Sequence, residues 1–237
     1  ISTNPCAGIM KRLGFKRRKS NSKKPLSVSE VKRFLDACLE VYPELHPLFL
    51  CVFRSGMRKG ELLALQWGDI DWEQRTIKVE RTIRKGRVGK PKTGQSRRVD
   101  MSSDLFDVLE SLRQERERGS SRTGRAIPGN IFHQGDGNPI PDTTAARICH
   151  RKCHHAGLTA FGWHTFRHTY GALLASAGAP MNYIKEQLGH SDITMTDRYS
   201  RFSPREDGSR EVNRLDGLFT DPTAPSDPTT DPHQADG

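Results

Sequence analysis

Apolar residues recur at the helical period through most of this sequence, and a single β-rich stretch between residues 76 and 100 interrupts them. The run from Thr76 to Ile83 is rich in β-branched residues, and Gly86 and Gly89 are suited to turns. Arg97 to Asp100 predicts a further short strand. Together these segments predict a small antiparallel sheet of about three strands. A mostly helical chain with one such sheet has an α+β fold.

The first predicted helix has the clearest start signal. Ser27 is a preferred N-cap residue, and Glu30 three positions later completes a capping box. Apolar side chains between Val31 and Cys38 share one face, so one side of this helix packs against a core. Further helices are predicted at about 44–54, 59–65, 103–118, 142–156, 165–177, 180–188, 192–199 and 209–218, with a loop-rich stretch at 119–141.

Composition divides the chain into three parts. Residues 1–25 carry eight Lys or Arg and no acidic residue, which predicts a basic linker that either contacts phosphates or stays solvated. Residues 26–218 form the predicted folded unit. Residues 219–237 contain four Pro, four Asp and no Lys or Arg, which predicts a disordered acidic tail. Because the first residue is Ile1 rather than Met, we expect the chain to be a fragment of a longer protein.

The chain is strongly basic, with a formal net charge of +10 and a pI of about 9.6. Such an excess favours a polyanionic partner, most often nucleic acid, over a basic protein without that role. No apolar run approaches the roughly 18 residues of a membrane-spanning helix, so we expect none.

Five cysteines are present, and this odd number fits a reducing cytosol better than a disulfide framework. Cys149, His150, Cys153, His154 and His155 lie close together, which raises a zinc site as an alternative. The two cysteines of this group are four positions apart on one helical face, whereas zinc sites more often use C-x2-C turns in pairs. Ordinary helix packing is therefore the favoured interpretation.

Four polar clusters lie at the edges of predicted elements. In SGMRKGELLAL (55–65), Arg58 and Glu61 are three positions apart on one helical face. Such a pair is either an ordinary surface ion pair or an arginine held at a helix start. GKPKTGQSRRV (89–99) predicts a hairpin tip rich in Gly and Lys, on which Lys92 faces solvent.

The third cluster, WHTFRHTYGALLASAG (163–178), places His164, Arg167 and His168 at the start of an otherwise apolar helix. Basic side chains are unfavourable beside the positive end of the helix dipole unless an anion binds there. A metal interpretation of the two histidines lacks the Glu of the H-E-x-x-H motif.

The fourth cluster, LGHSDITMTDRYSRF (188–202), contains His190 and Tyr199, one of only four tyrosines. Arg198 and Ser200 flank the tyrosine in a segment too polar for a core, so we expect its hydroxyl near solvent or a ligand. Across the clusters no carboxylate pair is present to hold Mg²⁺. This set suits metal-free phosphoryl transfer, in which arginines bind the phosphate, a tyrosine attacks it and a lysine protonates the leaving oxygen.

In this order and spacing the clusters resemble the motifs of the tyrosine recombinase (phage integrase) family, over about residues 26–203. SGMRKGELLALQWGDID is similar to the first arginine motif, KTGQSRRV to the β-hairpin motif, HTFRHTYGALLASAG to the His-x-x-Arg box and LGHSDITMTDRYS to the C-terminal box. The resemblance implies the DNA breaking–rejoining fold of the catalytic domain. It also implies the catalytic residues Arg58, Lys92, His164, Arg167, His190 and Tyr199, with Glu61 and His168 in support.

The resemblance further implies a site-specific DNA recombinase or integrase. Tyr199 would attack the scissile phosphate and form a 3′-phosphotyrosyl intermediate, without metal, ATP or another cofactor. The two arginines and His190 would hold the non-bridging oxygens. Lys92 would protonate the leaving 5′-oxygen, and His164 would help to accept the tyrosine proton.

The implied partners are double-stranded DNA, further copies of the chain in a tetramer on two DNA sites, and accessory DNA-bending or directionality proteins. The implied location is the cytoplasm, at the nucleoid, as the product of a bacterium, phage or other mobile element. From the resemblance we expect the family's N-terminal DNA-clamping domain to be missing from this fragment, with residues 1–25 as its linker. Residues 209–218 would pack on a neighbouring protomer or on their own domain.

Three alternatives remain open: a type IB topoisomerase-like enzyme that cuts and reseals, a non-catalytic DNA-binding module, and a zinc-binding protein.

Overall fold

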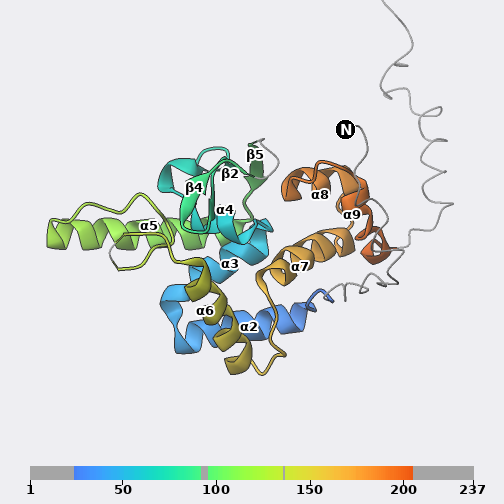
Figure 1. Ribbon diagram of the computed structural model, residues 1–237, viewed down its shortest axis with the longest axis horizontal. Coiled ribbons are helices and arrows are strands. Elements are labelled where there is room, and N and C mark those ends of the chain that lie inside the picture. Colours follow the sequence, from blue (N-terminus) through green and yellow to red (C-terminus); the bar gives the residue numbers. More distant parts are fainter. Residues whose placement is uncertain (1–23, 92–95, 136, 205–237) are drawn as a thin grey trace, which may run out of the picture.

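The computed structural model describes residues 24–91, 96–135 and 137–204 (Figure 1). Most of the predicted basic linker, the predicted helix at 209–218 and the predicted acidic tail lie outside these ranges. The described part is mostly helical with a small antiparallel sheet, as the periodicity predicts. None of its helices is long and apolar enough to cross a membrane.

The first described helix, α2 (Val28–Val41), begins at the predicted capping box. Ser27 Oγ accepts a hydrogen bond from Glu30 N at 3.2 Å, and Ser27 N donates to Glu30 Oε2 at 2.7 Å. Two backbone N–H groups at the helix start are thereby satisfied, so the sequence signal and the structure agree at this point.

A sharp turn separates the next two helices. The 3₁₀ turn η1 (Pro43–Leu45) leads into α3 (His46–Ser55), which ends at Gly56 with a φ of +59°. A Cβ atom on Gly56 would lie 2.3 Å from Cδ1 of Tyr170, so both the conformation and the space require glycine. The chain then enters the short helix α4 (Lys59–Leu63).

The predicted three-stranded antiparallel sheet is present and has the order β1-β2-β5. Its central strand pairs Ile77 with Ile70 on one side and with Val99 on the other, and all three side chains are buried. The 3₁₀ turn and strands of this region are η2 (Trp67–Asp69), β1 (Ile70–Asp71), β2 (Thr76–Val79) and β5 (Arg97–Asp100).

The predicted run from residue 76 to 83 is divided, because β3 (Thr82–Arg84) leaves the main sheet and pairs with β4 (Arg87–Gly89). Lys85 and Gly86, with φ of +50° and +74°, make the two-residue turn between them. The prediction that Gly89 provides a turn is wrong, since it lies in β4. The hairpin packs directly on α4, where a Cβ on Gly60 would lie 2.4 Å from the carbonyl oxygen of Ile83.

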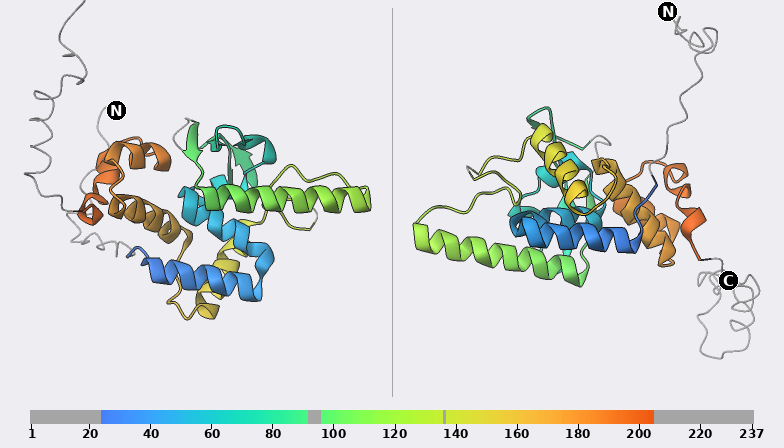
Figure 2. Two further views of the ribbon diagram at one scale, coloured as in Figure 1. Left: turned by 180° about the vertical axis from the view of Figure 1, so that it is seen from behind. Right: turned by 90° about the horizontal axis from the view of Figure 1, so that it is seen from below.

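The remaining helices follow the predicted order, with two differences in length. Helix α5 (Ser103–Thr123) runs past the predicted end at 118 and stops at Gly124, where φ is +67°, and it projects beyond the other elements (Figures 1 and 2). The predicted helix at 192–199 is shorter and is followed by a 3₁₀ turn. The later elements are α6 (Asp142–His155), α7 (Trp163–Ser176), α8 (Met181–Leu188), α9 (Thr194–Asp197) and η3 (Ser200–Phe202).

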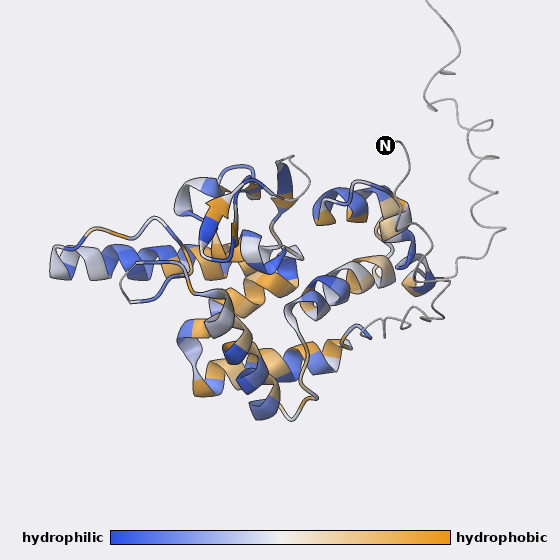
Figure 3. Ribbon diagram, viewed as in Figure 1, coloured by the Kyte–Doolittle hydropathy of each residue, from blue (hydrophilic) through white to orange (hydrophobic). Residues whose placement is uncertain are grey.

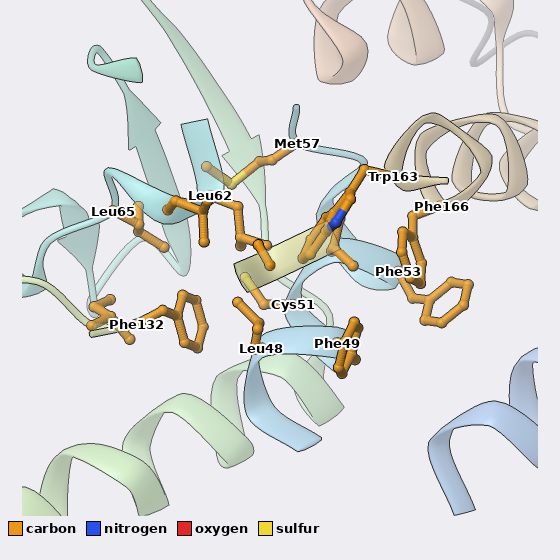
Figure 4. Close-up of a cluster of buried hydrophobic side chains, with 14 of the residues drawn as sticks. Leu48, Phe49, Cys51, Phe53, Met57, Leu62, Leu65, Phe132, Trp163 and Phe166 are labelled. Atoms are coloured by element: carbon orange, nitrogen blue, oxygen red, sulfur yellow. The ribbon is translucent and has the colours of Figure 1, made fainter. Parts of the chain in front are cut away.

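Buried apolar residues form two clusters. In the larger one the rings of Phe34, Phe49, Phe53 and Phe166 join α2, α3 and α7, with centroids of contacting pairs 4.7 to 5.7 Å apart. Figure 4 shows three of these phenylalanines beside Trp163, and Figure 3 shows the apolar faces turned toward the interior. The smaller cluster joins α7, α8 and the C-terminal turns and consists of Tyr170, Ala172, Ala175, Ile184, Leu188 and Tyr199.

The cysteine-rich helix α6 packs against α2 by its apolar side. Cys149 and Cys153 are buried in the larger cluster, and the Cys149 thiol lies 3.6 Å from the carbonyl oxygen of Phe161. His150 and His154 are exposed on the other side of the helix. These positions support helix packing, and the described residues contain no group of three side chains suited to hold a metal ion.

Candidate active site

Arg58 and Glu61 form the first part of the candidate site, at the N-terminus of α4. Glu61 Oε2 accepts from the Arg58 backbone N–H at 2.9 Å, and Arg58 Nη1 donates to Glu61 Oε1 at 2.9 Å. The Glu61 side chain is only 1% exposed, so the surface ion pair offered by the sequence is wrong. The alternative, an arginine held at a helix start, is correct.

Arg97 is a third member of this group that the sequence reasoning missed. Its Nη2 donates to Glu61 Oε2 at 2.8 Å, and its Nε donates to the carbonyl oxygen of Gln187 at 3.0 Å. One signal in the sequence was available. Arg97 is two positions from Val99 on β5, so both side chains point to the buried face of the strand.

Arg167 lies at the start of the second turn of α7 and is 6% exposed. Its Nη1 donates to the carbonyl oxygen of Gly56 at 2.9 Å, and its Nη2 donates to that of Leu188. Burial, followed by the charges of Arg58 and Arg97, lowers the pKa of this guanidinium to about 9. Three guanidiniums thus surround one carboxylate, and this unbalanced positive charge suits the binding of an anion.

His190 follows the C-terminal Gly189 of α8, and its Nδ1 lies 2.8 Å from Thr196 Oγ1. Burial, followed by the charges of Arg167 and Arg58, lowers the pKa of His190 to about 3. His190 is therefore neutral at physiological pH. A neutral imidazole donates from Nε2 when its Nδ1 accepts, and the Thr196 hydroxyl is placed to be the donor to Nδ1.

Arg58, Glu61, Arg97 and His190 line one cleft of about 830 Å³. Arg167 is not among the lining residues, but it donates to the carbonyl oxygen of Leu188, next to the lining residue Gly189. The wall of the cleft is formed by α4, β5, the start of α7 and the turn after α8. The side chain of His164, at the start of α7, is exposed on this wall. The structure therefore gathers residues more than 130 positions apart in the sequence. The predicted site residues on this wall are Arg58, Glu61, His164 and His190.

We expected the Tyr199 hydroxyl near solvent or a ligand; Tyr199 is buried, so the first of these alternatives is wrong. The residue is 2% exposed, and its ring packs on α7 where Gly171 leaves a slot. A Cβ on Gly171 would lie 2.7 Å from Tyr199 Cζ. The polar sequence around Tyr199 did not reveal this burial, because the slot belongs to a helix 28 positions earlier.

The hydroxyl of Tyr199 lies 2.9 Å from His168 Nδ1. Burial raises the pKa of Tyr199, while the charges of Arg167 and Arg198 oppose that change. Burial, followed by the charge of Arg198, lowers the pKa of His168, so that its ring is neutral and can accept a proton. The geometry assigns to His168 the contact that the sequence prediction gave to His164.

Lys92 lies outside the described residues, and its predicted role stays a prediction. The nearest described positions after it are Ser96, which lines the cleft, and Arg97.

Comparisons with known proteins agree on one family. The model of the phage integrase family matches residues 24–206. A tyrosine recombinase XerC-like protein of Caldanaerobacter subterraneus subsp. tengcongensis is 30% identical, over 92% of this chain and 61% of its own length. The ICEBs1 integrase of Bacillus subtilis is 31% identical, over 92% of this chain and 60% of its own length. The chain thus spans about three-fifths of the length of these relatives.

Solved structures show the same fold. The Tn1549 transposon integrase in complex with transposon right end DNA has a TM-score of 0.70 at 21% identity, covering 92% of this chain and 73% of that one. The catalytic domain of bacteriophage HP1 integrase has a TM-score of 0.60 at 20% identity, covering 83% of this chain and 96% of that one.

Proposed function

The chain belongs to the phage integrase family, and from this premise we propose that it is the catalytic part of a tyrosine-type site-specific DNA recombinase. One observation carries the proposal. Arg58, Arg167 and His190 converge from three distant segments, and a buried tyrosine lies within the electrostatic reach of Arg167. Such a set can bind a phosphodiester and present a nucleophile to it.

The two arginines and His190 bind the non-bridging oxygens of the scissile phosphate. As charge builds on these oxygens in the transition state, the guanidiniums and the Nε2–H of neutral His190 stabilise it. Removing one such donor is expected to slow cleavage by about 10²–10³-fold. The cleft-lining His164 is proposed to contact the same DNA strand.

The covalent step joins Tyr199 Oη to phosphorus and breaks the bond from phosphorus to the 5′-oxygen. The tyrosine proton passes to His168 Nδ1, which lies 2.9 Å away. The leaving 5′-oxygen takes a proton from Lys92, the proposed general acid. The phosphotyrosine conserves the energy of the phosphodiester, so a 5′-hydroxyl of a second duplex can reverse the step without a nucleotide cofactor.

We further propose double-stranded DNA as the substrate, a tetramer on two DNA sites as the active assembly, and accessory DNA-bending or directionality proteins as partners. Family membership and the mobile-element origin of relatives such as the ICEBs1 integrase support these assignments. We also propose a cytoplasmic, nucleoid-associated location in bacteria, which the bacterial sources of the relatives support. Assembly on two duplexes would separate this function from that of an enzyme that only cuts and reseals one duplex.

The test uses the full-length protein and a nicked suicide substrate that traps the covalent intermediate. Tyr199→Phe removes the nucleophilic oxygen, so no protein–DNA adduct should form. Tyr42→Phe is the matched control, because it removes a tyrosine hydroxyl away from the cleft and should leave the adduct intact. An adduct of undiminished yield with Tyr199→Phe would contradict the proposal.

A further inference from the structure

Arg97 contacts both walls of the cleft, although within the β-hairpin motif KTGQSRRV the resemblance assigns a catalytic role to Lys92 alone. Its side chain is 11% exposed. One end of the guanidinium bonds Glu61 on the α4 wall, and Nε bonds the carbonyl oxygen of Gln187 on the α8 wall. The aliphatic part lies against Gly189, where a Cβ would come within 2.6 Å of Arg97 Cδ.

The C-terminus of α8 is the feature that organises these contacts. Its last carbonyl oxygens have no partner within the helix and carry the negative end of the helix dipole. Arg97 donates to the carbonyl of Gln187, Arg167 to that of Leu188 and Arg58 to that of Gly189. Three consecutive carbonyls therefore accept from three different arginines, immediately before His190.

We infer that Arg97 is a positioning residue for DNA cleavage, which shares the charge of Glu61 with Arg58 and fixes the turn that carries His190. This inference rests on the proposed recombinase function. Arg97 acts through these neighbours, because two of its nitrogens are already bonded to protein acceptors.

The charge of Glu61 explains why a second arginine is needed. Glu61 is buried, with Oε1 bonded to Arg58 and Oε2 to Arg97. Burial acts to raise the pKa of Glu61, but the hydrogen bond and charge of Arg97, followed by those of Arg58, outweigh it and lower the pKa. Without Arg97 the full carboxylate charge would act on Arg58, which would then stabilise a bound phosphate less.

The backbone contacts give Arg97 its second role. Gly189 has a φ of +61°, and the Arg97 side chain covers it. The next residue is His190, so a shift of this turn would move the imidazole relative to Arg58 and Arg167. Displacements of about 1 Å in an active site can cost on the order of 10²-fold in rate.

The experiment compares Arg97→Ala and Arg97→Lys with Arg98→Ala in the full-length protein. Arg98 is adjacent on β5 and exposed on the opposite face. Three quantities are measured: the single-turnover rate of adduct formation on a nicked substrate, the DNA affinity with its salt dependence, and the thermal midpoint. We expect Arg97→Ala to slow adduct formation by about 10–100-fold, as for other residues that support a catalytic group. DNA affinity should stay within about twofold, and Arg98→Ala should cleave at the wild-type rate.

Chemical rescue separates positioning from a purely structural role. Methylguanidinium added to Arg97→Ala should restore part of the rate, because it can occupy the site between Glu61 and the α8 carbonyls. Arg97→Lys keeps the charge but can reach only one acceptor, so its rate should lie between those of wild type and Arg97→Ala. If Arg97→Ala does not fold, the rate of adduct formation by Arg97→Lys tests the inference in its place.

Four results would overturn the inference. A wild-type rate in both Arg97 variants would show that the residue is dispensable, and absence of rescue would indicate a structural role. A salt slope lower by about one unit would indicate a direct phosphate contact. A 5′-bridging phosphorothiolate substrate has a sulfur leaving group that needs no proton. If Arg97→Ala formed adduct at the wild-type rate on this substrate, the defect would lie in protonation of the leaving group. Failure of the recombinase function itself is distinct, since the wild-type protein would then form no Tyr199-dependent adduct.

Discussion

Two parts of the candidate site, the arginine side (Arg58, Arg97 and Arg167) and the tyrosine side (α9, η3 and Tyr199), are held by different kinds of interaction. On the arginine side, buried and half-buried guanidiniums donate to Glu61 and to backbone carbonyls at the C-terminal ends of α3 and α8. On the tyrosine side, a four-residue helix and a 3₁₀ turn carry a ring that rests in the slot over Gly171.

Under the proposed function, this difference matches the tasks of the two sides. A phosphate site must be formed before its ligand arrives, because donors that are already oriented stabilise charge without reorganisation. A nucleophile that forms and releases a covalent bond to DNA has to move with the strand. Tyr199 is held by packing in a small apolar cluster and by one contact with His168, with no ion pair among its described contacts.

The largest effect is expected on the arginine side. Arg167→Lys keeps a positive charge. A single ammonium group, however, cannot reach the carbonyls of Gly56 and Leu188 and bind a phosphate at the same time. We expect adduct formation to slow by about 10²–10³-fold. Arg54→Lys is the control, because Arg54 forms an exposed ion pair with Asp104. A loss below about threefold for Arg167→Lys would show that this side does not depend on fixed geometry.

Sequence reasoning selected candidate residues better than it described their surroundings. The resemblance to the family's motifs selected Arg58, Arg167 and His190, and the structure brings these three residues together. The burial of Glu61 and the role of Arg97 depend on contacts between β5 and α8, about 90 positions apart, and no local pattern encodes them. The burial of Tyr199 likewise depends on Gly171, which within its own segment is an ordinary helix residue.

The fold was predictable where a local signal was complete. The capping box at Ser27 fixes the start of α2, and the short strand predicted from Arg97 to Asp100 is β5. The separate β3–β4 hairpin was not predicted, because one β-rich run does not reveal that its second half pairs elsewhere. Its docking on α4 depends on the missing side chain of Gly60.

A second prediction tests the slot on the tyrosine side. Alanine is favoured over glycine within a helix by about 1 kcal/mol, but at Gly171 its Cβ would lie 2.7 Å from Tyr199 Cζ, so the ring must move. We expect Gly171→Ala to slow adduct formation by about 10–100-fold and to lower the thermal midpoint. Gly119→Ala in α5 is the matched control, because its Cβ meets open space and should raise the midpoint. Equal behaviour of the two variants would refute a role for the slot.

A third prediction concerns the link between the two sides. Thr196→Val keeps the shape of the side chain but removes the hydroxyl that lies 2.8 Å from His190 Nδ1. Without it, neutral His190 can place its proton on Nδ1 and lose the donor at Nε2. Adduct formation should slow by about tenfold, the equivalent of one hydrogen bond of about 1.4 kcal/mol. Thr196→Ser keeps a hydroxyl and should cleave close to the wild-type rate, whereas an equally slow serine variant would exclude control of the tautomer by Thr196.

The smallest expected effect is on stability and depends on pH, because the arginine side opposes the charged form of His190. Burial and the charges of Arg167 and Arg58 lower its pKa to about 3, whereas an unfolded histidine titrates near about 6.5. Between these values the unfolded chain binds more protons than the folded chain, so the free energy of unfolding falls as the pH drops below about 6.5. Urea unfolding at pH 7 and pH 5 should therefore show a smaller loss for His190→Asn than for the wild type. His168 is present in both proteins, so its contribution to the pH dependence cancels in the comparison. An equal loss in both would mean that the folded protein accommodates the charged imidazole, and that the arginine side is less strongly positive than its contacts indicate.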